Sequence, residues 1–300
     1  MKTRLALIVG LVAALPGMAG AQQALTFDAF ASADADHNRV RKAGLSFDWS
    51  RIDNADYRGI RLEDAMSSPA GGDAEHSKRI YYRFADRRSD GTWSWKGMLG
   101  TDGHTWLGNA SVVRESDWRQ EFFLERAAVE TARGIEERLH YTFAGAAFDL
   151  PVDERNVFTA LAGVQDFSGR NLRQHLRARY IRVLSETHGL SFQVRLRYAH
   201  DRVPHEYDYF SPRWYARAIP MLQWRRFRGG WQYRVAAGVG RQADADSGWR
   251  AAQLLEASVT SPADQDGWWL RASTVHTNEP SSFGNGYRYT QAMLTLGRRF

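Results

Sequence analysis

The 300-residue chain contains no cysteine, only 8 prolines and, beyond its first residues, no long apolar run. The lack of cysteine excludes a disulfide scaffold, a thiolate metal site, a cysteine nucleophile and an N-terminal lipidated cysteine. A helical membrane protein is also excluded, because no later stretch approaches the roughly 18 consecutive apolar residues that a spanning helix needs. Disorder is excluded by the aromatic content, which is 15 Phe, 12 Tyr and 11 Trp.

The charge is only mildly basic. The 40 Lys and Arg exceed the 34 Asp and Glu, which gives a net charge of +6. This excess is too small to indicate a surface that binds nucleic acid, so no nucleic-acid partner is expected. The 9 histidines show no HExxH spacing, so the sequence predicts no metal site and no cofactor.

The N-terminus has the pattern of an export signal. Lys2 and Arg4 precede an apolar run over 5–16, and the small residues Ala19 and Ala21 give a cleavage pattern. The sequence therefore predicts a cleaved signal peptide over 1–21, followed by one domain over 22–300 without an internal linker.

The rest of the chain alternates in character with period two. In the run 172–183, Leu172, Leu176 and Tyr180 share one parity, while Arg177 and Arg179 share the other. A helix would distribute these arginines over three faces, whereas a strand places them on one. Counting such runs predicts about sixteen strands with about 17 residues for each strand and its connection, which fits membrane strands of roughly 9–11 residues.

Three features favour a membrane barrel over a soluble β-protein. Aromatic residues lie near strand ends, as in Trp268 and Trp269, where interfacial girdles need them. The chain ends on a strand whose last residue is Phe300, as outer-membrane barrels do. The strands also carry many arginines, which only a wide aqueous lumen can solvate. We therefore expect an all-β, transmembrane, antiparallel up-and-down β-barrel in the bacterial outer membrane, surrounded by its lipid.

If Leu190 and Phe192 face lipid, the opposite parity lines the lumen. The predicted pore-lining residues are Arg173, His175, Arg177, Arg179, Arg195, Arg197, Arg213, Arg217 and Arg225. Guanidinium groups bind carboxylate, sulfate or phosphate and set anion preference in a pore, although they also serve as structural partners of acidic side chains. The acids predicted to oppose them are Asp149, Asp153, Glu154, Asp166 and Glu256.

The segment 209–215 is the richest in aromatic residues. Its rings are candidates for stacking on sugar faces at the pore mouth, and the alternative is an interfacial girdle. The candidates are Tyr209, Phe210, Trp214 and Tyr215.

Three segments carry a family resemblance: 121–131 (EFFLERAAVET), 149–167 (DLPVDERNVFTALAGVQDF) and 209–226 (YFSPRWYARAIPMLQWRR). Over about residues 115–300 the chain resembles the C-terminal barrels of bacterial exopolysaccharide export porins, of the poly-β-1,6-N-acetylglucosamine porin type. The resemblance implies a sixteen-stranded barrel that passes a linear polysaccharide. Those porins carry a periplasmic tetratricopeptide superhelix before the barrel, whereas here the signal is expected to run almost directly into the first strand. A separate tetratricopeptide or synthase-complex protein is therefore a candidate partner.

The expected function is a passive saccharide channel, as in exopolysaccharide export for a biofilm matrix, and not an enzyme. Two alternatives from other classes remain. One is an outer-membrane hydrolase acting on lipid or surface polymer, for which the Ser/His candidates are His104 with Ser111, and His276 with Ser281 or Ser282, although no GxSxG motif accompanies them. The other is a non-conducting scaffold barrel with a plugged lumen.

Overall fold

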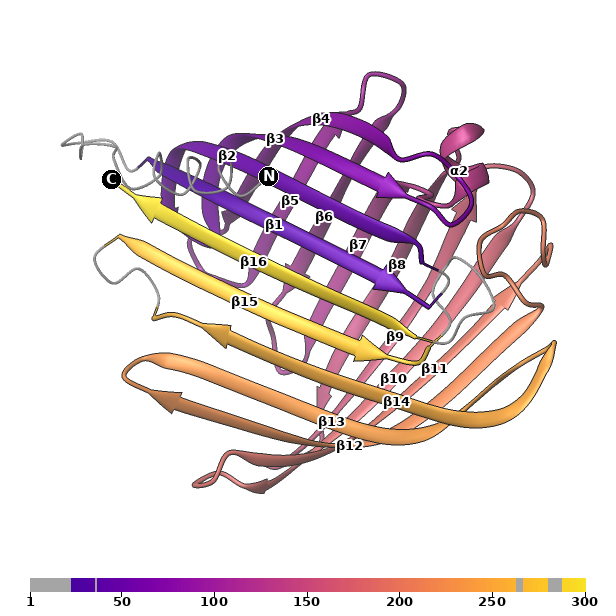
Figure 1. Ribbon diagram of the computed structural model, residues 1–300. Coiled ribbons are helices and arrows are strands. Elements are labelled where there is room, and N and C mark those ends of the chain that lie inside the picture. The colour runs from indigo at the N-terminus through magenta and orange to yellow at the C-terminus, as the bar shows by residue number, and fades with distance from the viewer. Residues whose placement is uncertain (1–22, 36, 263–266, 280–287) are drawn as a thin grey trace.

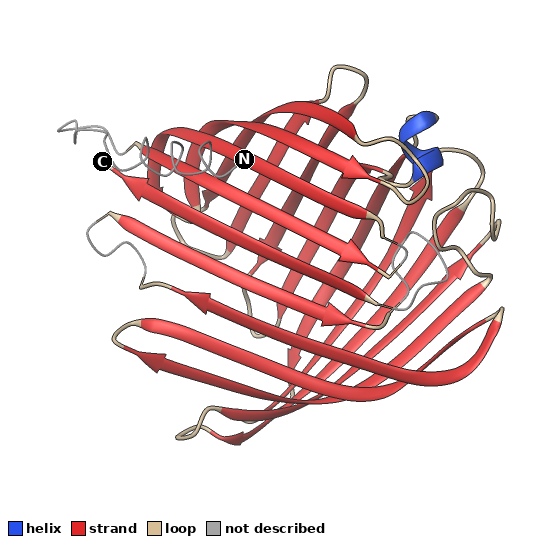
Figure 2. Cartoon of the chain, in the orientation of Figure 1, coloured by secondary structure: helices blue, strands red, loops and turns tan. Residues whose placement is uncertain are grey.

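The computed structural model describes residues 23–35, 37–262, 267–279 and 288–300, so the predicted signal peptide lies outside the described residues. These residues form sixteen strands and one short helix (Figures 1 and 2). The strands are β1 (Ala24–Asp34), β2 (Arg39–Asp53), β3 (Asp56–Ser68), β4 (Glu75–Arg87), β5 (Trp93–Thr101), β6 (Trp106–Arg114), β7 (Arg119–Ala128), β8 (His140–Pro151), β9 (Asn156–Phe167), β10 (Leu172–Ser185), β11 (Leu190–Asp201), β12 (Trp214–Arg228), β13 (Trp231–Asp244), β14 (Ser247–Thr260), β15 (Trp268–Thr277) and β16 (Tyr289–Arg299). The helix α2 (Ala132–Glu136) lies between β7 and β8.

The sheet closes on itself. Each strand pairs antiparallel with its neighbour in sequence, and β1 pairs with β16 from Ala24 opposite Arg299 to Asp34 opposite Tyr289. Beyond this ladder, Gln23 and Phe300 exchange two backbone hydrogen bonds of 3.2 and 3.0 Å. Closure leaves no unpaired sheet edge, which is the condition for a sheet that lies in lipid. The predicted sixteen-stranded barrel is confirmed.

The two ends of the barrel differ in the length of their connections. The end where β1 begins and β16 ends has tight turns such as 54–55 and 229–230, whereas the opposite end carries the long connections 129–139 and 202–213 (Figure 1). Outer-membrane barrels have short periplasmic turns and longer extracellular loops, so Gln23 and Phe300 lie on the periplasmic side. Along the described ranges, no helix is long and apolar enough to cross a membrane.

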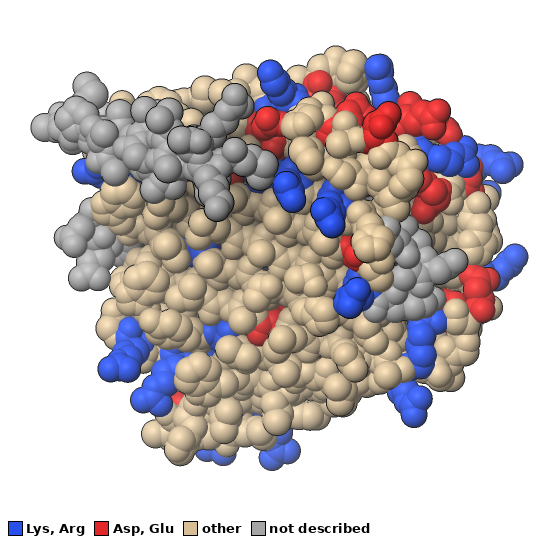
Figure 3. Space-filling view, viewed as in Figure 1, with Lys and Arg blue, Asp and Glu red and all other residues tan. Residues whose placement is uncertain are grey.

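The exterior of the barrel is apolar. The face shown in Figure 3 is mostly uncharged over its middle, and charged side chains gather toward the two ends. The large apolar side chains that stand exposed include Phe47, Ile60, Leu62, Ile80, Leu99, Phe122, Val164, Leu176, Leu196, Leu222 and Val239. Because alternate strand residues point to opposite faces, the polar residues between them point into the lumen.

The wall bends sharply at β12–β14 (Figure 1). Pro220 carries no N–H, and the β12–β13 ladder pairs Ala218 with Arg241 and Met221 with Gly238 while skipping the residues between. A Cβ on Gly240 would lie 1.9 Å from the Ala218 carbonyl oxygen, so only glycine permits this approach. The inner side of the bend holds an apolar cluster of Ile219, Met221, Ala236, Ala252 and Leu254, against which Val275 packs.

Candidate functional site

The predicted pore-lining residues span the barrel from one rim to the other. Leu176 is 56% exposed and Leu196 is 48% exposed on the outside, so the opposite parity of β10 and β11 faces the lumen. This lumen face carries Arg173, His175, Arg177 and Arg179 from β10, Arg195 and Arg197 from β11, and Arg217 and Arg225 from β12. Arg213 differs, because it lies in the connection that precedes β12 and not on a strand.

Of the predicted pore-lining residues on β10, the two nearest the extracellular rim have protein partners. Arg173 Nε lies 2.9 Å from Asp201 Oδ1, and Arg173 also donates to the Phe210 carbonyl, which ties the 202–213 loop to the wall. His175 is buried, with its Nε2 at 2.9 Å from Gln165 Oε1. These two residues hold the wall and the loop in place.

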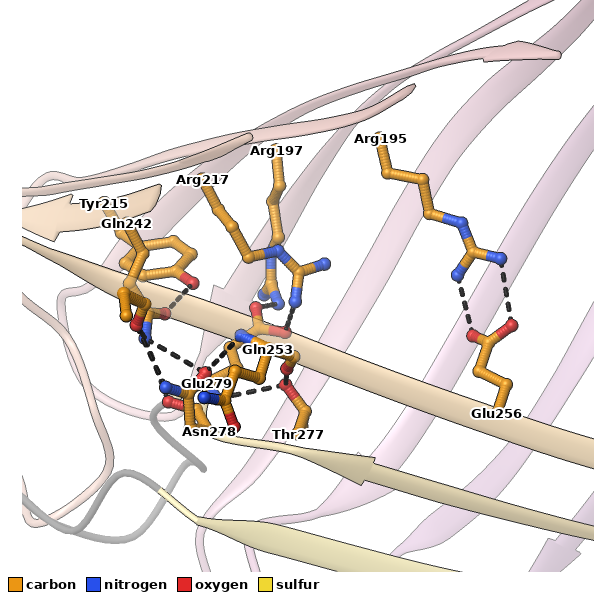
Figure 4. Close-up of polar contacts among 11 residues, drawn as sticks. Arg195, Arg197, Tyr215, Arg217, Gln242, Gln253, Glu256, Thr277, Asn278 and Glu279 are labelled. Atoms are coloured by element: carbon orange, nitrogen blue, oxygen red, sulfur yellow. Dashed lines mark hydrogen bonds and ion pairs between the residues drawn. The ribbon is translucent and has the colours of Figure 1, made fainter. Parts of the chain in front are cut away.

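Ion pairs cover the bend in the wall (Figure 4). Arg195 on β11 reaches over β12 and β13 to Glu256 on β14, with a bidentate contact of 2.7 and 2.9 Å. Arg197 and Arg217 share the carboxylate of Glu279, which follows β15. Both sets of contacts lie above the apolar cluster of β12–β14, so they form the charged inner surface of this part of the pore.

The middle of the wall carries two arginines that form no ion pair within the described part of the chain. Among the residues that the structure describes, neither Arg177 nor Arg179 has a hydrogen-bond or ion-pair partner. Arg225, close to the periplasmic turn, is exposed and lies 5.8 Å from the Phe227 ring. The wall of β10–β12 is therefore rich in cations that are free to attract an anion from the lumen.

The opposite wall is closer to electrical balance. Arg61 lies 2.9 Å from Glu63, and Arg79 lies 3.3 Å from Glu63 and 3.4 Å from Glu130. Further pairs in this network are Lys42–Glu130, Arg61–Asp28, Arg51–Asp48 and Arg83–Asp48. The interior thus has one nearly neutral wall on β1–β4 and one cationic wall on β10–β12.

Of the five acids predicted to oppose the arginines, only Glu256 contacts one of them. Asp149 accepts a hydrogen bond from Thr159 instead, and Asp153 caps the β8–β9 turn. There, hydrogen bonds from the Arg155 backbone N–H and the Asn156 side chain lower the pKa of Asp153. The sequence analysis missed Asp201 and Glu279, because a period-two pattern does not tell which distant strand faces which.

The rings proposed for sugar stacking are largely occupied by protein contacts. Tyr209 is only 3% exposed, and its ring stacks on Phe167 with the centroids 4.2 Å apart. Burial raises the pKa of Tyr209 to about 12. Tyr215 is buried and donates its hydroxyl to Gln242 Oε1 at 2.9 Å.

The other two aromatic candidates flank this packing. The Phe210 ring meets the Tyr215 ring edge-on at 5.8 Å, and Trp214 is half-buried at the start of β12. The role of these rings in stacking on sugar faces stays a prediction.

Two extracellular connections pack on one another. Asp208 of the 202–213 loop accepts hydrogen bonds from Thr131 Oγ1 at 2.6 Å and from the Arg133 N–H at 2.8 Å, at the start of α2. Tyr209 joins Phe167, Val129 and Leu139 in a small apolar cluster. Because Phe167 is at the extracellular end of β9, this packing folds the loop inward over the barrel mouth.

Replacing Tyr209 with alanine is expected to release the 202–213 loop without unfolding the barrel. The substitution removes the stacked ring from its buried site, so the loop opens locally and trypsin cleavage within it becomes at least about tenfold faster. Limited proteolysis of the folded protein in detergent measures this. Tyr209→Phe, which loses only the contact with Asn171, should remain close to the wild type, and equal cleavage of both variants would contradict the packing role.

Of the Ser/His candidates for hydrolysis, His104 and Ser111 are not brought together. His104 lies in the β5–β6 turn with Nδ1 at 3.2 Å from Arg138, whereas Ser111 is the sixth residue of β6, about 17 Å along the strand. His276 Nδ1 lies 2.8 Å from Thr290 Oγ1. Ser281 and Ser282 lie outside the described residues.

A closed barrel of sixteen strands with an apolar exterior and a charged lumen is a bacterial outer-membrane β-barrel. No protein-family model matches the chain. No curated protein matches it either.

Solved structures with a similar fold include proteins that their descriptions assign to the outer membrane. A bacterial polysaccharide outer membrane secretin superposes with a TM-score of 0.69 at 14% identity, covering 93% of this chain and 98% of that one. Pseudomonas aeruginosa OccK5 has a TM-score of 0.44 at 9% identity, with 93% and 98% covered. Vibrio cholerae OmpT has a TM-score of 0.47 at 7% identity, with 95% and 99% covered.

One prediction from the sequence needs correction. The prediction that the chain is not an enzyme is wrong as an exclusion, because a barrel fold does not determine whether a protein has an activity. The structure separates His104 from Ser111, which removes one candidate pair only.

Proposed function

We propose that the protein is an outer-membrane channel for saccharide and that it exports an exopolysaccharide of the biofilm-matrix type. The observation that carries this proposal is the cationic wall, which runs through the lumen from Arg173 to Arg225 and leaves charges such as Arg177 without a protein partner. A plugged scaffold barrel would instead neutralise its interior, as the β1–β4 wall does. The described polysaccharide secretin, which has the same fold, supports a saccharide as cargo.

Conduction needs no chemical step under this proposal. Hydrated saccharide moves through the lumen, and weak contacts at several positions along the wall allow both entry and release. A periplasmic tetratricopeptide or synthase-complex partner would feed the polymer at the end with short turns, where both described termini lie. The loop packing around Tyr209 narrows the extracellular exit.

The folded protein is expected to give stable current steps in a planar lipid bilayer, with anions passing more readily than cations, because the lumen wall carries excess positive charge. Reversal potentials in a salt gradient measure this preference. Liposomes containing the protein should swell in isotonic solutions of small oligosaccharides. Heat-unfolded protein is the control for both assays, and absence of current from protein verified as folded would contradict the channel.

A further inference from the structure

Arg177 is an accessible cation in the middle of the lumen wall. Its side chain is exposed, in contrast to the buried His175 two residues earlier, and Arg179 next to it on the same face is half-buried. Within the described parts of the chain, neither guanidinium has a hydrogen bond or an ion pair. Guanidinium groups in proteins normally find an acceptor, so two adjacent ones without an acceptor indicate a site whose acceptor comes from outside.

The neighbouring arginines show which acceptor fits. Arg177 is directly opposite Arg197, and Arg197 is directly opposite Arg217, so three like charges face one another across β10–β12. Such a row is repulsive unless anions intervene. The protein supplies the Glu279 carboxylate to Arg197 and Arg217, whereas among the described residues Arg177 forms no ion pair and has only longer-range attraction from Glu279 and Glu125. The row of arginines therefore binds the Glu279 carboxylate at Arg197 and Arg217, and it has no ion-paired carboxylate at Arg177 within the described residues.

The strands on the other side of Arg177 offer apolar and aromatic surface. In register with Arg177 are Leu161 on β9 and then Ala147 on β8, which are uncharged. Toward the extracellular rim, Gly145 on β8 is directly opposite Gly163 on β9. A Cβ added at these glycines would lie 2.6 Å from the Phe123 ring and 2.8 Å from the Phe143 ring, so the two rings lie against the wall at the glycines.

Both phenylalanines are half-buried. Phe123 on β7 and Phe143 on β8 have their ring centroids 5.1 Å apart, and Phe143 lies 4.9 Å from the His175 ring. Unlike Tyr209 and Tyr215, these rings belong to the barrel wall and not to a packed loop. Aromatic rings accept the apolar C–H faces of sugars, while an arginine fork binds a carboxylate on the same sugar.

We infer that Arg177 and Arg179, together with Phe123 and Phe143, form a lumen site for a carboxylate-bearing sugar, so the cargo is an acidic polysaccharide of the uronic-acid class. This inference rests on the proposed saccharide channel and specifies its substrate. Phosphate or another small anion shares the chemistry of the carboxylate, whereas only a sugar uses the rings as well. The polymer would bind through one sugar unit at a time, and it would advance when the next unit replaces the bound one.

The test is calorimetric titration of the full-length folded protein in detergent with trigalacturonate, and with its methyl ester as the uncharged control. Trigalacturonate should bind at least about tenfold more tightly than the ester. The double variant Arg177→Gln/Arg179→Gln should lose about tenfold or more of this affinity, because it loses charge-assisted hydrogen bonds. Arg182→Gln changes the same strand on its outer face and should bind as the wild type does.

A second variant separates sugar from simple anion binding. Phe123→Leu should weaken trigalacturonate several-fold and leave inorganic phosphate unchanged. Equal binding of the ester, full affinity in the double variant, or phosphate binding as tight as trigalacturonate would each overturn the inference. Failure of the channel itself is distinguishable, because it appears as absent current in the bilayer, whereas the titration needs no conduction.

Discussion

Replacing Glu279 with glutamine is expected to raise the anion preference of the channel several-fold and to tighten trigalacturonate binding by about tenfold. Glu279 is the carboxylate that Arg197 and Arg217 share, and glutamine keeps its shape while removing its charge. Since Arg177 lies directly opposite Arg197, the change adds free positive charge beside the proposed sugar site. Reversal potentials measure the first effect, and calorimetric titration measures the second.

The control for this variant is Glu186→Gln. Glu186 is exposed in the periplasmic β10–β11 turn, so its replacement changes the net charge equally but leaves the lumen wall intact. Ion selectivity and sugar affinity should then match the wild type. An unchanged reversal potential in Glu279→Gln, with the protein verified as folded, would mean that the Glu279 carboxylate does not govern the charge that permeating ions meet.

The fold could be predicted because a barrel strand needs only a local pattern. In β10, Arg173, Arg177 and Arg179 share one parity while Leu172, Leu176 and Tyr180 share the other, and one parity must meet lipid while the other meets water. The turn at Gly189, with φ of 66°, separates β10 from β11 where the sequence placed a turn. The barrel and its strand number followed from such local signals, since each strand pairs with the next one along the chain.

The contacts within the lumen could not be predicted in this way. Arg195 and Glu256 are 61 residues apart and meet only because the wall bends at Pro220 and Gly240. In β2, an irregularity in the ladder between Asp48 and Ser50 brings Arg51 to the same side as Asp48, at 2.8 Å, although their spacing is odd. Strict alternation assigns those two residues to opposite faces.

The aromatic segment 209–215 illustrates a different limit. Composition correctly drew attention to it, but composition does not distinguish a ring that is free for a ligand from one that is covered by protein. Tyr209 is covered because Phe167, at the end of β9, lies parallel to it. The proximity of Phe123 and Phe143 could not be predicted from composition either, because it depends on the register of β7 and β8.

Replacing Glu256 with glutamine is expected to destabilise the barrel by about 2–3 kcal/mol, below the ~3–5 kcal/mol for breaking a fully buried pair. The Arg195 and Glu256 side chains are 18% and 15% exposed, so lumen water screens the remaining charge only in part. The loss leaves Arg195 above the apolar cluster around Ile219 without its bidentate acceptor. Urea unfolding of the protein in lipid or detergent measures the change in free energy.

A double-mutant cycle with Arg195→Gln separates the pair from its surroundings. The double variant should recover part of the loss, because it no longer holds an unpaired guanidinium over apolar side chains. Asp53→Asn breaks the Arg87–Asp53 pair, whose side chains are 47% and 41% exposed, and should cost less than about 1 kcal/mol. Equal losses for Glu256→Gln and Asp53→Asn would show that water fills the space between β11 and β14. In that case the bend of the wall, and not its ion pairs, would determine the shape of the pore.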